Sequence, residues 1–258
     1  MPRLTHPRAR ICGGPGLGKT QVCIQLAVNA QLPLEFGGLG CDTLYIDTEG
    51  SLMPERVADM AAAAGAHLRQ HYAGGNHPGG QQQALPSFVE GWTPDAVLSR
   101  IHVYRAHDAV TQAALCTALP ALIAARPRVR LVILDSVAFH YRHGWSTDYA
   151  ARARSLASTF TALLQFAAQH GVAVVVTNQV TTKPGGGGGG GGSGKLAPAL
   201  GESFAHAATC RVLLFWQQRS RTALLFKSPR QPRGTAPYAV TADGVRPIRH
   251  GKRPAGTG

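Results

Sequence analysis

The sequence predicts an α/β protein with a mostly parallel central sheet flanked by helices and a C-terminal antiparallel hairpin. Two observations predict this class. Short apolar segments alternate with segments of helix length along most of the chain, and a glycine-rich turn follows the first apolar segment. Such alternation is typical of parallel strands joined by right-handed helical crossovers. With 258 residues, 44% of them hydrophobic, the chain can bury a sizeable core.

The predicted elements follow in chain order, beginning with the short strand "ARIC" (9–12). Strands that are buried on both faces of a parallel sheet are apolar without clean alternation. Four later runs have this character: "TLYID" (43–47), "IHVYR" (101–105), "RLVILD" (130–135) and "VAVVVTN" (172–178). The helix-length segments between strands cover about 19–31, 54–70, 108–125 and 148–169.

The C-terminal part has a different pattern. Two strand-like runs, "TCRVLLFW" (209–216) and "TALLFK" (222–227), are separated by a polar turn and predict an antiparallel hairpin. A third run, "YAVTADG", ends near residue 244. We therefore divide the chain into an N-terminal extension (1–10), one core domain (11–245) and a basic, disordered tail (246–258), which could alternatively be a nuclear signal.

The charge is strongly positive. There are 26 Lys and Arg against 13 Asp and Glu, for a net charge of +13. After Glu202 the only acid is Asp243, so the C-terminal half carries most of the excess. This balance favours a polyanionic partner, nucleic acid above all, although a compositional bias of the genome is an alternative.

Other functional classes are not indicated. The five cysteines are scattered without a CxxC motif, so neither a zinc site nor a disulfide framework is predicted. The sequence contains no apolar run of about 18 residues and no signal-peptide pattern. We expect a soluble, intracellular protein that does not act at a membrane.

The segment "ICGGPGLGKT" (11–20) fits the phosphate-binding pattern G-x-x-x-x-G-K-[ST]. Glycines let backbone N–H groups turn toward a phosphate, and the N-terminus of the following helix favours the same anion. Lys19 would contact the β- and γ-phosphates of ATP, and the Thr20 hydroxyl would bind Mg²⁺. The nucleotide-binding residues predicted here are Gly13, Gly14, Pro15, Gly16, Leu17, Gly18, Lys19, Thr20 and Gln21.

Three further residues follow the ends of other strands. Asp135 ends "RLVILD" and is predicted to be the second magnesium-side residue, while Glu49 in "YIDTEGS" is predicted to activate the attacking water. Gln179 either contacts the γ-phosphate or simply closes its strand. Because parallel strands present their carboxyl ends at one edge, we expect these side chains to face one site.

The set "ICGGPGLGKT", "IDTEGS", "VRLVILDS" and "VTNQVTTK", in this order, resembles the ATPase core of RecA-type recombinases. Together with "PALGESFAHAATCRVLLFW" it is most similar to the eukaryotic paralogs of the strand-exchange recombinase, especially the C-paralog branch of homologous-recombination repair proteins. The resemblance covers about residues 10 to 245 and implies a RecA-like P-loop NTPase fold with ATP and Mg²⁺ as cofactors.

The resemblance also implies roles for other positions. Segments 137–149 and 180–201 correspond to two DNA-facing loops; Arg142 matches the basic position of the first. Arg56 matches a residue that stacks on adenine. Lys227 begins a segment that covers ATP bound by a neighbouring protomer. The family's N-terminal helical domain and linker have no counterpart here, so the resemblance leaves self-polymerisation open.

Eight consecutive glycines (185–192) lie within the second of these loops, bordered by Lys183 and Lys195 as predicted DNA contacts. We interpret the tract as part of a loop inside one domain, not as a linker between domains. A repeat expansion tolerated in a surface loop is the simpler explanation. His140 and His143 lack Cys or carboxylate partners in the sequence and are interpreted as loop residues and not metal ligands.

The resemblance implies a nuclear, ATP-dependent, DNA-binding repair protein of homologous recombination that assembles with other paralogs. Its expected partners are single-stranded or branched DNA, other paralogs and the recombinase itself, and slow ATP turnover is expected. Two alternatives stay open. One is a scaffold subunit that does not hydrolyse ATP, and the other is a ring-forming ATPase or helicase on the same core.

Overall fold

The computed structural model describes residues 8–73, 86–142, 149–183, 195–198 and 208–248. Its elements alternate as predicted through the first 183 residues. The strands and longer helices in this part are β1 (Arg8–Gly13), α1 (Lys19–Asn29), β2 (Asp42–Asp47), α2 (Pro54–Ala73), β3 (Ile101–Arg105), α5 (Ala109–Ala124), β4 (Val129–Asp135), α6 (Tyr149–His170) and β5 (Ala173–Lys183). Two short helices, α3 (Ser87–Glu90) and α4 (Pro94–Ser99), were not predicted.

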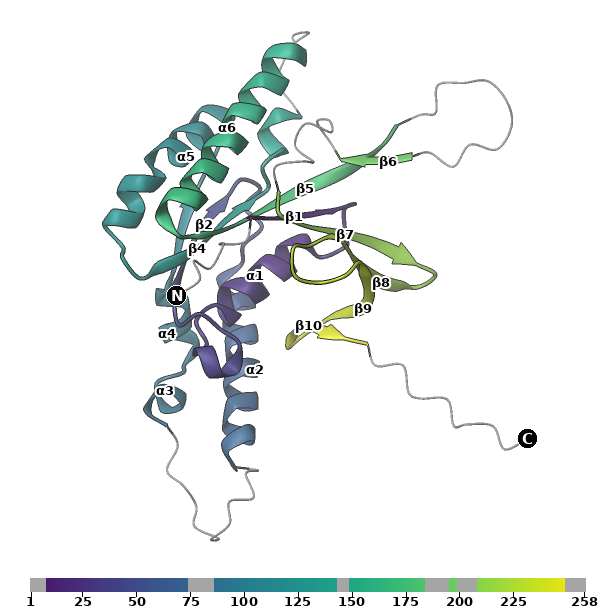
Figure 1. Ribbon diagram of the computed structural model, residues 1–258. Coiled ribbons are helices and arrows are strands. Elements are labelled where there is room, and N and C mark those ends of the chain that lie inside the picture. Colours follow the sequence, from purple (N-terminus) through teal and green to yellow (C-terminus); the bar gives the residue numbers. More distant parts are fainter. Residues whose placement is uncertain (1–7, 74–85, 143–148, 184–194, 199–207, 249–258) are drawn as a thin grey trace, which may run out of the picture.

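The remaining strands are β6 (Lys195–Pro198), β7 (Cys210–Gln217), β8 (Ser220–Lys227), β9 (Gly234–Thr241) and β10 (Gly244–Pro247). The sheet has the order β10-β9-β8-β7-β1-β5-β4-β2-β3, and β6 pairs with β5 outside this path (Figure 1). All pairs from β3 to β7 are parallel, whereas β7 to β10 pair antiparallel. The predicted mostly parallel sheet and C-terminal hairpin are confirmed.

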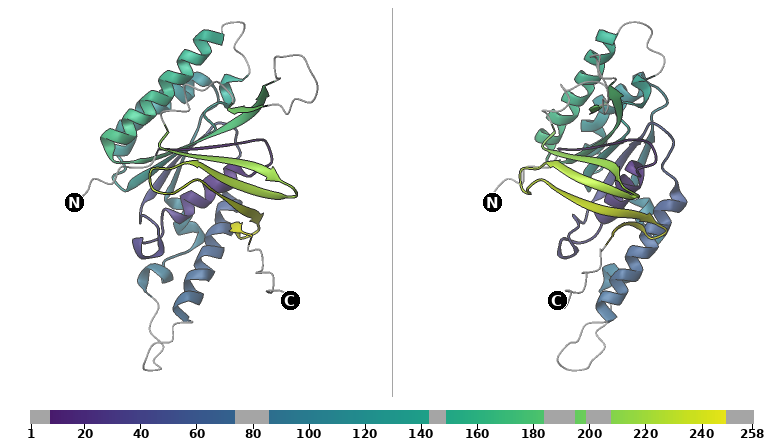
Figure 2. Two further views of the ribbon diagram at one scale, coloured as in Figure 1. Left: turned by 45° about the vertical axis from the view of Figure 1, so that its right-hand side comes forward. Right: turned by 90° about the vertical axis from the view of Figure 1, so that its right-hand side faces the viewer.

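Helices cover both faces of the parallel part of the sheet (Figures 1 and 2). Side chains of α1 and α2, such as Ile24 and Met60, pack with Val175 of β5 in one core. Side chains of α5 and α6, such as Leu119 and Leu163, form a second core on the opposite face, together with strand residues including Val174 and Val176. Both faces are buried, which is why these strands are apolar throughout.

Strand boundaries differ from the predicted ones at three places. β5 runs to Lys183, five residues past the predicted end, because β6 supplies an antiparallel partner from Val180 onward. The second predicted DNA-facing loop (180–201) therefore begins and nearly ends in paired strands, while its glycine tract lies outside the described residues. β1 begins at Arg8 and β10 ends at Pro247, so paired structure extends beyond the predicted core limits of 11 and 245.

None of the helices in the described ranges is long and apolar enough to cross a membrane.

Candidate nucleotide-binding site

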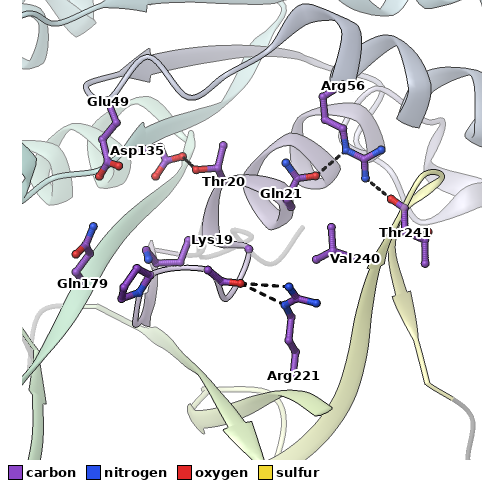
Figure 3. Close-up of a pocket in the computed structure, with 13 residues that line it drawn as sticks. Lys19, Thr20, Gln21, Glu49, Arg56, Asp135, Gln179, Arg221, Val240 and Thr241 are labelled. Carbon is purple, nitrogen blue, oxygen red and sulfur yellow. Dashed lines mark hydrogen bonds between the residues drawn. The ribbon is translucent and has the colours of Figure 1, made fainter. Parts of the chain in front are cut away.

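The predicted site residues meet at the carboxyl edge of the parallel strands. The strand register places Gly13 of β1 beside Gln179 of β5, and Asp47 of β2 beside Asp135 of β4. A pocket of about 560 Å³ opens at this edge (Figure 3). Its lining residues are Pro15, Gly16, Gly18, Lys19, Thr20, Gln21, Glu49, Arg56, Asp135, Gln179, Arg221, Val240 and Thr241.

The loop between β1 and α1 requires glycine at specific positions. Gly16 and Gly18 have φ angles of 74° and 83°, a region that side chains with a Cβ rarely adopt. At Gly13 a Cβ atom would lie 3.0 Å from both the Cβ and the carbonyl oxygen of Leu214 on the neighbouring strand. The loop therefore brings its backbone against the pocket and directs the N-terminus of α1 into it, an arrangement suited to phosphate.

Lys19 is the first residue of α1, and its side chain is held over the loop. Its Nζ donates a hydrogen bond to the carbonyl of Gly14 at 2.9 Å. The side chain is 9% exposed, and this burial lowers the pKa of Lys19, while the charges of Asp135 and Glu49 oppose the shift. A partly desolvated ammonium next to exposed backbone N–H groups forms a strong site for phosphate oxygens.

Asp135 is 2% exposed and is held by three hydroxyl groups. Thr20 and Tyr45 donate to Oδ2 at 2.7 and 2.9 Å, and Thr177 donates to Oδ1. The Thr20 hydroxyl and the Asp135 carboxylate are thus in contact, as the prediction of a shared magnesium site requires. Hard oxygen donors of this kind fit Mg²⁺.

Glu49 lies at the same end of the pocket as Asp135 and Gln179 (Figure 3). Its Oε1 accepts a hydrogen bond from the Ser136 hydroxyl at 2.9 Å, which fixes the carboxylate beside β4. In many P-loop hydrolases an acidic residue directly follows the magnesium-side aspartate and activates the attacking water. In this chain that position is Ser136. It instead orients the glutamate that comes from the neighbouring strand.

Asp47 builds the loop that carries Glu49. Its Oδ1 accepts hydrogen bonds from the backbone N–H groups of Glu49, Gly50 and Ser51, at 3.1, 2.8 and 3.3 Å. The guanidinium of Arg105 lies 3.1 Å from the same oxygen. Sequence reasoning passed over Asp47, although an Asp that ends a buried strand just before a turn is a signal for this kind of capping.

The opposite end of the pocket is formed by Arg56, Val240 and Thr241 (Figure 3). Nε of Arg56 donates to Oε1 of Gln21 at 2.7 Å, and its terminal nitrogens donate to the carbonyls of Thr241 and Ala242. This arrangement leaves the planar guanidinium fixed at the pocket wall. Arg56 was predicted to stack on adenine, and in the structure it lines this end of the pocket.

Arg221 of β8 was missed by the sequence analysis. Its Nε and one terminal nitrogen each lie 3.3 Å from the carbonyl oxygen of Gly16, and its guanidinium is stacked 4.8 Å from the ring centre of Trp216. Tyr238 of β9 donates to the carbonyl of Leu17 at 2.6 Å. No local motif marks these residues, because they come from strands about 200 positions further along the chain.

The predicted DNA contacts lie outside this pocket's lining. Arg142 projects inward: its Nε and one terminal nitrogen are shielded from water and have no hydrogen-bond partner within the described part of the chain. Burial lowers the pKa of Arg142, and the charge of Glu49 opposes that shift. Lys183 and Lys195 face each other across the β5–β6 pair by backbone register. Lys227 donates to the carbonyl of Ala208 at 3.3 Å and does not line the pocket.

His140 hydrogen bonds through Nε2 to the carbonyl of Ala106 at 2.8 Å, and His143 lies outside the described residues. In the part of the chain that the structure describes, no three His, Cys, Asp or Glu side chains gather as a metal-binding group.

The mostly parallel sheet, the glycine-rich loop and the Thr20–Asp135–Glu49 cluster define a RecA-like P-loop nucleotide-binding protein. Comparison with known proteins agrees: the Rad51 family model matches residues 7–71 and 87–248. The chain belongs to the Rad51 family, whose members are nucleotide-binding proteins with a RecA-like core. The resemblance inferred from the sequence is thereby confirmed.

Two curated relatives bear the name "DNA repair protein RAD51 homolog 3". The one from Cricetulus griseus is 40% identical over 236 residues, which cover 92% of this chain and 62% of the relative. The one from Dictyostelium discoideum is 35% identical over 238 residues, which cover 92% of this chain and 59% of the relative. The chain therefore spans about three fifths of the length of these relatives.

Proposed function

We propose that this chain binds ATP with Mg²⁺, hydrolyses it slowly and uses this cycle in homologous-recombination repair of DNA. The observation that carries the proposal is the contact between Thr20 and Asp135 beside Glu49, at the mouth of the glycine-rich loop. Both relatives are named as DNA repair proteins, and the net charge of +13 suits a DNA partner.

In the proposed reaction, Lys19 and the N–H groups of the loop hold the β- and γ-phosphates and favour the charge that develops on them. Thr20 and Asp135 would hold Mg²⁺, which when bound supplies further charge neutralisation. Glu49, oriented by Ser136, accepts a hydrogen bond from the attacking water and takes its proton. Gln179 faces the same end of the pocket and would contact the γ-phosphate.

For DNA binding we propose Arg142 together with Lys183 and Lys195 at the paired ends of β5 and β6. Arg142 lies within electrostatic range of Glu49, so this residue would link the DNA-facing segment to the ATP site. Lys227 stands away from the chain's own pocket, which suits a contact with ATP bound by a neighbouring protomer. We propose other recombinase paralogs as these neighbours, and the nucleus as the location.

Single-turnover hydrolysis of radiolabelled ATP tests the enzyme proposal. We expect Glu49→Gln to bind ATP like the wild type and to release phosphate about 10²-fold more slowly or worse, because it lacks the base. Lys19→Ala should lose ATP binding as well. If all three proteins release phosphate at equal rates, the site does not hydrolyse ATP, and a scaffold role in a paralog complex remains.

A further inference from the structure

Three basic residues lie side by side on three neighbouring strands: Arg10 of β1, Arg211 of β7 and Lys227 of β8. The register pairs Arg10 with Arg211, and Arg211 with Lys227. Residues directly opposite on adjacent strands point to the same face of a sheet and are about 5 Å apart, as holds for Arg10 and Arg211. The register between β7 and β8 shifts by a bulge between Arg211 and Val212, next to the Arg211–Lys227 pair. The three residues, which we call the basic row, therefore extend about 10 Å across the sheet.

The basic row lies on the face that α6 covers further along the sheet, since Arg10 is also paired with Val176 of the second core. Exposure increases along the row. Arg10 is 4% exposed, Arg211 is half-buried and Lys227 is exposed. The row thus leads from the protein surface at β8 to the interior at β1, where β1, β7 and β8 lie next to one another (Figure 1).

The two arginines lack acceptors. Nε and one terminal nitrogen of Arg10, and Nε of Arg211, are shielded from water and have no hydrogen-bond partner among the residues that the structure describes. The ion pairs formed by described residues include none from Arg10, Arg211 or Lys227. Burial and the neighbouring charge of Arg10 both lower the pKa of Arg211. An unpaired guanidinium in this environment is destabilising, and a bound anion would remove much of that penalty.

The position of the basic row separates it from the sites already described. Arg10 lies three residues before Gly13, so the row is set back from the strand edge where the nucleotide pocket, Arg142 and the β5–β6 pair lie. Arg10 is only 4% exposed, which favours a small anionic group such as a carboxylate, and carboxylates match guanidinium geometry.

We propose that the basic row is a docking site for an acidic segment of a partner protein, with one carboxylate bound between Arg211 and Lys227 and Arg10 directly behind. The site shares Lys227 with the contact proposed above for a neighbour's ATP, whereas Arg10 and Arg211 take no part in the ATP and DNA sites of the proposed function. The three cations of the basic row form no ion pair with a carboxylate of the described residues, so a carboxylate from a partner would complement their charge.

The proposed binding of an acidic segment can be tested on the full chain by measuring the affinity for a fluorescein-labelled decaglutamate peptide by fluorescence anisotropy. In Arg10→Glu a carboxylate from the chain itself lies next to Arg211. We expect this variant to melt at a higher temperature than the wild type and to bind the peptide at least about tenfold more weakly. Arg230→Glu makes the same charge change at an exposed position nearby, and it should weaken binding by about twofold at most.

Arg10→Met and Arg211→Met provide a second pair that keeps side-chain volume, in case the charge reversal prevents folding. We expect both to weaken peptide binding. Equal losses in Arg10→Glu and Arg230→Glu would mean general charge attraction and would overturn the proposal. Unchanged peptide binding, or a loss confined to a labelled thymidine oligonucleotide, would also overturn it. ATP binding is measured on the same proteins. Only the enzyme proposal requires ATP binding, so this measurement separates a failure of that proposal from a failure of the docking proposal.

Discussion

Replacing Gly13 by alanine tests the packing between the phosphate-binding loop and the sheet. A Cβ at this position would lie 3.0 Å from two atoms of Leu214 and 3.2 Å from Cδ1 of Leu17. The Leu214 carbonyl belongs to the β1–β7 ladder and cannot move away freely. Overpacking of this kind costs about 1–3 kcal/mol, and each kcal/mol lowers the melting temperature of a domain of this size by about 2–4 °C.

Gly14→Ala is the matched control, because a Cβ there would meet only Cδ1 of Leu17, at an ordinary 3.8 Å. Differential scanning fluorimetry should show a lower melting temperature for Gly13→Ala, by roughly 2–12 °C, and little change for Gly14→Ala. ATP affinity should fall for Gly13→Ala, since the loop must shift to make room. If both variants have the melting temperature of the wild type, the close approach of β1 and β7 at Gly13 does not constrain the loop.

Three further predictions concern the site and the loop beyond β5. Asp47→Asn should destabilise the fold by about 2–3 kcal/mol in urea unfolding and slow ATP turnover, because the turn carrying Glu49 loses its charged acceptor; a normal turnover would refute this role. Because the lowered pKa of Lys19 lets the unfolded chain bind that proton more tightly, the unfolding free energy should rise with pH between this pKa and the ordinary 10.5, and the rise should be missing from Lys19→Met. Shortening 185–192 to three residues should leave ATP binding unchanged and alter single-strand DNA affinity modestly in a salt-dependent binding assay; a large loss would mean that the tract's length matters.

Much of the fold could be predicted because its information is local. The strands that include Ile46, Val132 and Val175 are buried on both faces, so their sequences are apolar without interruption. The helix over 108–125 is likewise marked by Asp108, whose side chain accepts a hydrogen bond from the N–H of Thr111. The glycine-rich loop could be predicted for the same reason, because its own glycines allow the positive φ angles that its backbone adopts.

The rest depends on pairing between distant segments. A strand pattern at 209–216 does not reveal that β7 lies parallel to β1, and this pairing brings Arg10 beside Arg211. The same pairing places β8 and β9 against the loop, which is how Arg221 reaches the nucleotide pocket and Tyr238 reaches the carbonyl of Leu17. The inward direction of Arg142 depends on how its segment folds back toward Glu49. No spacing in the sequence encodes these contacts.

The register of β5 with β6 has a consequence for molecular evolution. Lys183 and Lys195 are directly paired, so the two ends of the segment between them lie next to each other. The distance that the intervening segment must span is therefore the same whatever its length. Doubling the number of its residues costs only about 0.6 kcal/mol in closure entropy. Glycine codons at this point can be gained or lost by replication slippage with little selection from folding. We therefore expect the tract's length to vary among individuals or close species, and the same point should accept an inserted tag.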